Sequence, residues 1–123
     1  MPRQILFTSD SQWTGPEGWD LVGIDQPDDD RRVIAAAQAL LPIDESIVLG
    51  GHGAMGRLLP RIAFARRAAR RPVLGYLLVD CDLPVVAGDW PDAPVTFVAS
   101  TPEFRTHLKV AADRGWSIRD QIT

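Results

Sequence analysis

The sequence predicts an α/β fold with three layers: a mostly parallel sheet of about five strands and helices on both faces. Strand-like apolar runs alternate with helical patterns along the chain, which favours right-handed βαβ crossovers. Several of the strand-like runs are apolar at consecutive positions, as in strands that are buried on both faces. With 123 residues, of which 46% are hydrophobic and 24% charged, the chain predicts a single domain, residues 1–123.

Five runs have the composition of strands, because they are rich in apolar and β-branched residues and are bounded by turn-forming residues. They are residues 4–8, 20–24, 46–49, 73–79 and 95–99. The longest irregular stretches, residues 9–19 and 81–94, each follow one of these runs. Since ligands bind beyond the carboxyl ends of parallel strands, we expect both loops to border a site.

Three stretches have helical patterns. Residues 31–41 follow three aspartates, whose carboxylates cap free N–H groups and suit the positive end of the helix dipole. Residues 54–70 carry apolar side chains at helical spacing, although Pro60 predicts a kink or a later start. Residues 102–114 have a proline near the start and Gly115 just past the end, which is typical of a helix.

Charge and composition exclude several classes of protein. The formal net charge of −3 gives no electrostatic reason to expect nucleic acid or a membrane surface as a partner. Six arginines within residues 57–71 indicate a solvated helix face balanced by nearby acids, rather than a phosphate site. The single cysteine, Cys81, excludes an internal disulfide. Because no membrane span or signal peptide is recognisable, we expect a cytoplasmic protein.

The glycine-rich turn within residues 46–56 follows a strand and precedes a helix, and two chemistries use that geometry. In the first, Gly51, Gly53 and Gly56 form the dinucleotide fingerprint GxGxxG, whose backbone N–H groups receive a pyrophosphate. That fingerprint usually lies in the first βαβ unit, whereas this turn follows the third strand. In the second, the turn is a nucleophile elbow, which needs small residues because the turn is sharp.

The chain resembles small bacterial α/β-hydrolases well beyond this turn. Residues 51–56 resemble a Gly-His-Ser-x-x-Gly elbow in which Gly53 replaces the serine. Residues 74–84 resemble the following strand and loop, which often read Tyr-x-x-Val-Asp-x-x-Leu-Pro, and residues 90–105 with 114–116 resemble the next strand and helix. Residues 5–15 resemble the first functional strand and the oxyanion loop. The resemblance implies a shortened α/β-hydrolase-like domain, with Asp80 at the family aspartate that orients a histidine.

Three departures from the hydrolase pattern bear on function. Gly53 has no side chain, so we do not expect hydrolysis through an acyl-enzyme. We expect the last strand of the resembled proteins, and the loop with their catalytic histidine, to be missing. The segment between Ser9 and Asp20 is too short for a helix, so one face of the sheet is expected to be bare. We expect a homodimer to cover the exposed apolar surface and strand edge.

The candidate catalytic residues are His52 and Asp80. An unperturbed imidazole titrates near neutral pH, which suits proton transfer, although the histidine of such a turn also packs locally. Asp80 leaves the end of a buried strand, where a carboxylate either takes part in catalysis or caps a loop. Backbone N–H groups near Gly53 and in the first loop would stabilise an oxyanion. The expected ligand-binding residues are Ser9, Asp10, Trp13, Gly53, Ala54, Asp82 and Trp90.

These residues predict a non-hydrolytic protein that binds a small, mostly apolar carbonyl compound, with no metal and no cofactor. The accessible reactions are proton transfer, dehydration, cyclisation and isomerisation, for example in specialised metabolism. A non-catalytic binding or structural partner is the first alternative. The second is a nucleotide-binding domain that uses the three glycines of the turn.

Overall fold

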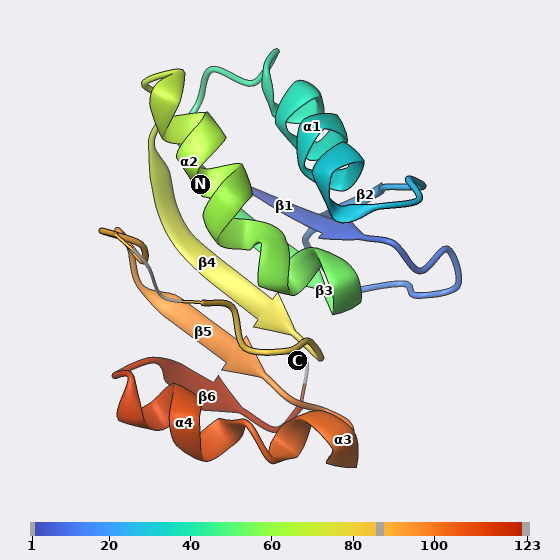
Figure 1. Ribbon diagram of the computed structural model, residues 1–123, viewed down its shortest axis with the longest axis vertical. Helices are drawn as coiled ribbons and strands as arrows, with labels where there is room; N and C mark the ends of the chain where they lie inside the picture. The colour runs from blue at the N-terminus through green and yellow to red at the C-terminus, as the bar shows by residue number, and fades with distance from the viewer. Residues whose placement is uncertain (1, 86–87, 122–123) are drawn as a thin grey trace.

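The computed structural model describes residues 2–85 and 88–121, which form one sheet of six parallel strands with helices (Figure 1). The strand order is β2-β1-β3-β4-β5-β6. The strands are β1 (Arg3–Thr8), β2 (Asp20–Gly23), β3 (Ile47–His52), β4 (Val73–Val79), β5 (Val95–Val98) and β6 (Ser117–Arg119). The helices are α1 (Asp29–Leu40), the 3₁₀ helix η1 (Gly53–Leu58), α2 (Leu59–Ala68), α3 (Pro102–Arg105) and α4 (Leu108–Asp113).

The three predicted helices are present, with corrected boundaries. The N-cap of α1 is Asp28, whose side chain accepts a hydrogen bond from the Arg31 N–H at 2.9 Å. Pro60 lies in the first turn of α2, where its missing N–H costs nothing, so the late start was the correct alternative. The 3₁₀ helix η1 occupies the preceding residues. The predicted helix at residues 102–114 is divided into α3 and α4.

A sixth strand corrects the predicted number of about five. Strand β6 pairs in parallel with β5, with Thr96 opposite Ser117 and Val98 opposite Arg119. Its three residues are all exposed, so it lacks the apolar run that reveals the other strands. Backbone pairing with its neighbour therefore defines this strand, rather than burial of its side chains.

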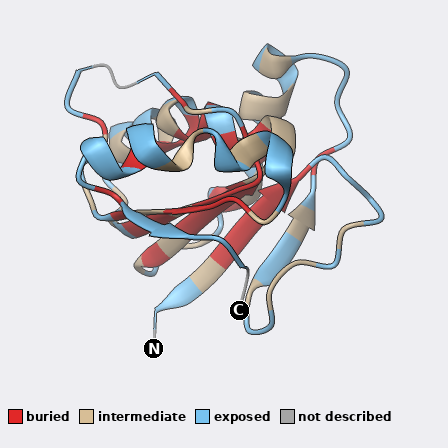
Figure 2. Cartoon of the chain, turned by 90° about the horizontal axis from the view of Figure 1, so that it is seen from below, coloured by how far each residue is buried: buried red, intermediate tan, exposed pale blue. Residues whose placement is uncertain are grey.

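The helices cover one face of the sheet only, so the prediction of helices on both faces was wrong (Figures 1 and 2). The connections from β2 to β3, from β3 to β4 and from β5 to β6 all step in the same direction across the sheet. Right-handed crossovers in one direction place every helix on the same side. The connection from β1 to β2 steps the opposite way, but residues 9–19 contain no helix.

The two faces of the sheet have cores of different size. The larger core lies under the helices and includes Phe7, Leu49, Leu78 and Phe97, each 0% exposed. On the opposite face, a small cluster of Leu6, Val79 and Val98 packs against Trp13 and Trp19 from the first loop. The expected shortage of cover on one face is therefore confirmed, and two loop tryptophans cover part of that face.

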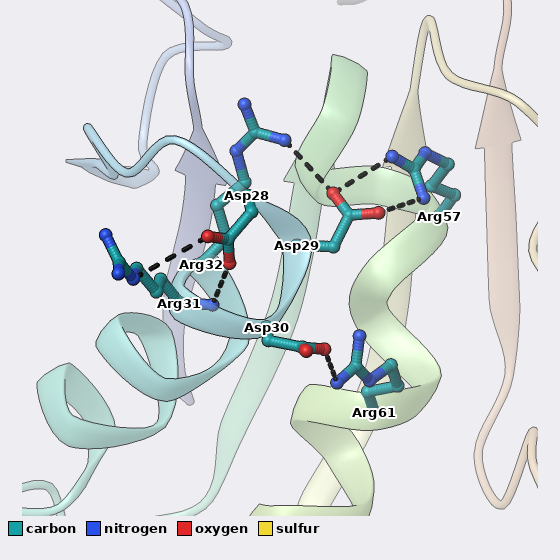
Figure 3. A network of polar contacts seen from close by, with 7 residues as sticks. All are labelled: Asp28, Asp29, Asp30, Arg31, Arg32, Arg57 and Arg61. Atoms are coloured by element: carbon teal, nitrogen blue, oxygen red, sulfur yellow. Dashed lines mark hydrogen bonds and ion pairs between the residues drawn. The ribbon is translucent and has the colours of Figure 1, made fainter.

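Four of the six arginines within residues 57–71 pair with aspartates as predicted, namely Arg57, Arg61, Arg67 and Arg71, whereas Arg66 is 4% exposed, so the prediction of a solvated side chain is wrong for Arg66. Figure 3 shows Arg57 of η1 paired with Asp29 and Arg61 of α2 paired with Asp30, both at the start of α1; the distances are 2.8 Å and 2.7 Å. Arg67 pairs with Asp89 in the same way. Exposed pairs of this kind stabilise a fold by about 0–1 kcal/mol each. Within residues 2–85 and 88–121, no helix is both long and apolar enough to cross a bilayer.

Candidate functional site

The candidate site lies at the point where the strand order changes direction. The chain leaves β1 toward one edge of the sheet and leaves β3 toward the other, so the carboxyl ends of these neighbours form a topological switch point. Thr8 and His52, the last residues of the two strands, are partners in the register. An open cavity of about 610 Å³ begins there. It is lined by Ser9, Asp10, Trp13, His52, Gly53, Asp80, Ser100, Thr101, Glu103 and Phe104.

The imidazole of His52 is held on two sides. Its Nδ1 lies 2.8 Å from the Thr8 Oγ1. The indole of Trp13 stacks on the ring, with 3.8 Å between ring centroids and 4° between the planes. Among the residues that the structure describes, none forms a hydrogen bond with Nε2. The ring is therefore fixed in place, and Nε2 is the nitrogen that remains for a ligand.

Burial lowers the pKa of His52 from its ordinary value of 6.5. The loss of hydration on burial is the largest cause, and the negative charges of Asp80 and Asp10 oppose it by raising the pKa. Since desolvation prevails, the imidazole is neutral at neutral pH. A neutral imidazole both accepts and donates a hydrogen bond, as proton transfer and carbonyl recognition require.

Asp80 lines the cavity but is bound to the loop after β5 rather than to His52. Its Oδ1 accepts the Ser100 N–H at 2.7 Å, and its Oδ2 accepts the Ser100 hydroxyl. The backbone of Asp80 has a φ of 44°, a conformation that is uncommon outside glycine. The carboxylate thus caps the loop after β5. The negative charge of Asp80 acts on His52 by raising the imidazole pKa, against the effect of burial, and not through a hydrogen bond.

The turn itself has the close packing that both of its predicted functions require. A Cβ on Gly51 would lie 2.8 Å from the Gly56 Cα, and one on Gly56 would lie 2.4 Å from the Cys81 Sγ. Gly53 has a φ of 60°, and a Cβ there would meet nothing within 4 Å. Two glycines therefore allow close packing, whereas Gly53 supplies a left-handed turn beside an open space.

The structure brings some of the expected binding residues to the cavity and separates others. Ser9, Asp10, Trp13 and Gly53 line it, as expected, whereas Ala54 does not.

Trp90 and Asp82 lie outside the cavity. Trp90 is 5% exposed and packs against Tyr76 and Trp116 in the larger core, because the loop after β4 crosses the helix-covered face. The Asp82 side chain is 72% exposed, and its Oδ1 lies 3.6 Å from the His107 Nε2. Sequence position after a strand end was therefore not sufficient to place these two side chains.

Sequence reasoning missed the contact of Thr8 with His52 and four further residues of the site. Thr8 positions His52, and Ser100, Thr101, Glu103 and Phe104 contribute the far wall of the cavity. Four of them follow β5, so the rule that selected the loops after β1 and β4 applies equally to the loop after β5. The loop that contains Ser100 was therefore predictable from the sequence, whereas the bond between Ser100 and Asp80 was not.

The charge of the cavity wall is negative. Its described lining includes the carboxylates of Asp10, Asp80 and Glu103 but neither lysine nor arginine. Within the described chain, no group of three or more His, Cys, Asp or Glu side chains is arranged to hold a metal ion. Such a wall repels a pyrophosphate or a carboxylate and accepts an uncharged ligand.

The sole cysteine is unsuited to nucleophilic attack. Cys81 is 1% exposed, and burial raises the pKa of its thiol to about 12. The reactive form of cysteine is the thiolate, which is scarce at neutral pH when the pKa is that high.

Comparison of the chain with models of known protein families, with curated proteins and with solved structures found no match. The resemblance to α/β-hydrolases therefore remains a prediction from the sequence. The structure supports the coarser class, an α/β fold with a parallel sheet.

Proposed function

We propose that the chain binds a small, mostly apolar and uncharged carbonyl compound in the cavity at the switch point, and that His52 takes part in proton transfer there. The observation that carries this proposal is the placement of a neutral imidazole, fixed by Thr8 and Trp13, in the wall of that cavity. The aromatic side chains of Trp13 and Phe104 supply apolar contact, while the Ser9 loop and the Gly53 turn supply polar groups.

The reactions that suit this site need no covalent intermediate. No serine stands at residue 53, and the Ser100 hydroxyl is bound by Asp80. Enolisation, isomerisation, dehydration and cyclisation all depend on proton transfer next to a carbonyl group. We include these four reactions in the proposal, within the chemistry of specialised metabolism, in a cytoplasmic protein without a cofactor.

Binding of cyclohexanone, followed by amide chemical shifts, tests the proposal. We expect saturable shifts at Ser9, Gly53 and Ser100, and no comparable shifts with benzoate, because the carboxylates of the wall repel an anion. His52→Ala removes a hydrogen-bonding partner worth about 1 kcal/mol and should weaken binding about five- to tenfold. His107→Ala is the matched control. Equal binding of benzoate, or full affinity in His52→Ala, contradicts the proposal.

The fold should also become less stable when His52 is protonated. Its pKa is lowered in the folded protein, so the unfolded chain binds this proton more readily. The stabilisation from neutral His52 is complete above the unfolded value of 6.5 and declines as the pH falls through the folded pKa. Urea unfolding between pH 7 and pH 5 should show a smaller loss of stability in His52→Asn than in the unchanged protein. Identical pH profiles refute this expectation.

A non-catalytic partner and a nucleotide-binding domain are the alternatives. Native mass spectrometry of the protein purified without added ligand distinguishes them, because a retained compound is weighed directly. A carbonyl compound of low mass supports the proposal, whereas a nucleotide supports phosphate binding at the glycine turn. The acidic wall disfavours the nucleotide.

We also propose that two copies associate. The helix-free face is only partly covered by the first loop. Ile34 on α1, Leu41 just after α1 and Phe64 on α2 are also exposed, and Phe64 is 70% exposed. Light scattering at micromolar concentration should therefore give the mass of a dimer, and the mass of a monomer contradicts the proposal.

A further inference from the structure

The hydroxyl group of Thr8 connects the backbone of the first loop to the ring of His52. Thr8 is 2% exposed, so its hydroxyl is shielded from bulk water. Its Oγ1 accepts the Asp10 N–H at 3.1 Å and lies 2.8 Å from the His52 Nδ1. The direction of the second hydrogen bond decides which ring nitrogen carries the proton.

A count of donors and acceptors settles that direction. A threonine hydroxyl has one proton to donate and two lone pairs that accept. One lone pair receives the Asp10 N–H, and the only acceptor that the described residues offer to the proton is Nδ1. If Nδ1 carried the proton instead, the buried hydroxyl of Thr8 would donate to no described residue, at a cost of about 1–3 kcal/mol. Donation from Thr8 to Nδ1 gives both of these atoms a partner and leaves the Nε2 N–H for the open cavity that His52 lines.

We infer that Thr8 holds neutral His52 in the tautomer protonated at Nε2, so that the ring presents an N–H donor to a carbonyl oxygen in the cavity. Trp13, stacked parallel to the ring, prevents the imidazole from tilting out of this alignment. The ligand half of the inference rests on the proposed function, whereas the tautomer half does not. Thr8 is thus a positioning residue that acts through His52.

This assignment makes the resting imidazole a hydrogen-bond donor toward the cavity, so its part in proton transfer is to give the Nε2 proton to the carbonyl oxygen rather than to remove a proton from the ligand. A neutral imidazole that donates to a carbonyl oxygen polarises the C=O bond without bringing a net charge into the site. Burial keeps the ring neutral by lowering its pKa. The ligand must accordingly offer an acceptor to Nε2, and a ligand of the same shape without an acceptor loses this contact.

The tautomer is measured on the ligand-free protein by ¹⁵N–¹H correlation of the imidazole rings. The chain has two histidines, and His107→Gln assigns the signals of His52. We expect Nε2 to be protonated and Nδ1 to be unprotonated above pH 7. Thr8→Ser should retain this pattern, because serine keeps the hydroxyl, whereas Thr8→Val should admit a measurable share of the ring protonated at Nδ1, since no described residue then donates to that nitrogen. A ring protonated at Nδ1 in the unchanged protein, or the same tautomer populations in Thr8→Val as in the unchanged protein, overturns the inference.

A matched pair of ligands tests the ligand half of the inference, that the Nε2 N–H donates to a carbonyl oxygen. Cyclohexanone and methylenecyclohexane have similar shapes, but only the ketone has an oxygen acceptor. We expect about tenfold tighter binding of the ketone to the unchanged protein and to Thr8→Ser, with a smaller difference in Thr8→Val. Equal binding of the two compounds to the unchanged protein overturns the ligand half.

The two experiments test the proposed function and the role of Thr8 separately. The Nε2 tautomer without ketone binding refutes the proposed function and keeps Thr8 as the positioning residue. Ketone binding with the Nδ1 tautomer keeps the proposed function and refutes the role of Thr8.

Discussion

Gly56→Ala should destabilise the protein by about 3 kcal/mol, because the new methyl group has no room. Its Cβ would lie 2.4 Å from the Cys81 Sγ, 2.6 Å from the Cys81 Cβ and 3.2 Å from the Gly51 carbonyl oxygen. Cys81 is 1% exposed, so it has no solvent to move into. Gly56 lies within η1, where alanine is otherwise preferred over glycine by about 1 kcal/mol. A loss of stability therefore isolates the steric effect. Urea unfolding measures it.

Gly53→Ala is the matched control for this substitution. It makes the same chemical change three residues earlier, at a φ of 60° but with nothing within 4 Å of the new Cβ. We expect it to cost about 1–2 kcal/mol from backbone strain alone. If Gly56→Ala is no more destabilising than Gly53→Ala, Cys81 does not lie close enough to Gly56 to exclude a methyl group.

A second-site change provides an independent check. Cys81→Gly removes both atoms that a Cβ on Gly56 would strike, whereas Cys81→Ala leaves the Cβ in place. Gly56→Ala should therefore cost much less in the Cys81→Gly background than in the Cys81→Ala background. The coupling free energy from the double-mutant cycle gives the size of the contact.

Arg66→Met should destabilise the protein by about 3–5 kcal/mol. Arg66 is 4% exposed, and its guanidinium donates to the carbonyl oxygens of Leu40, Ile43 and Glu45 at 2.8–3.0 Å. These carbonyl groups lie at the end of α1 and in the loop that leads into β3. A hydrogen bond with a charged donor contributes about 1.5–3 kcal/mol, and methionine leaves three acceptors without this partner.

Two variants separate this effect from a general loss of charge. Arg61→Met alters the same helix at a side chain that is 51% exposed and paired with Asp30, so it should cost less than about 1 kcal/mol. Arg66→Lys keeps the charge without the planar fork of donors, so the stability of this variant should lie between those of Arg66→Met and Arg61→Met. Equal midpoints of denaturation for Arg66→Met and Arg61→Met would show that Arg66 does not hold the end of α1.

Local patterns predicted most of the fold, because they depend on neighbours in the chain. The cap at Asp28 defined the start of α1, and the apolar runs revealed five of the six strands. Strand β6 escaped detection because pairing with β5 defines it. The residues of the candidate site also include some that local patterns predict and some that they do not. His52, Gly53 and Asp80 follow from strand ends, whereas Ser100 is associated with them only through the adjacency of β4 and β5.

The sequence by itself determined that this is an α/β chain with a glycine turn, a histidine at a strand end and no side chain at residue 53. Only the tertiary structure decided that all helices share one face, since strand order sets the side of each crossover. It also decided that Trp13 stacks on His52 while Trp90 enters the core. The pairing of Thr8 with His52 spans 44 residues and results from the register of β1 and β3, which no local pattern encodes.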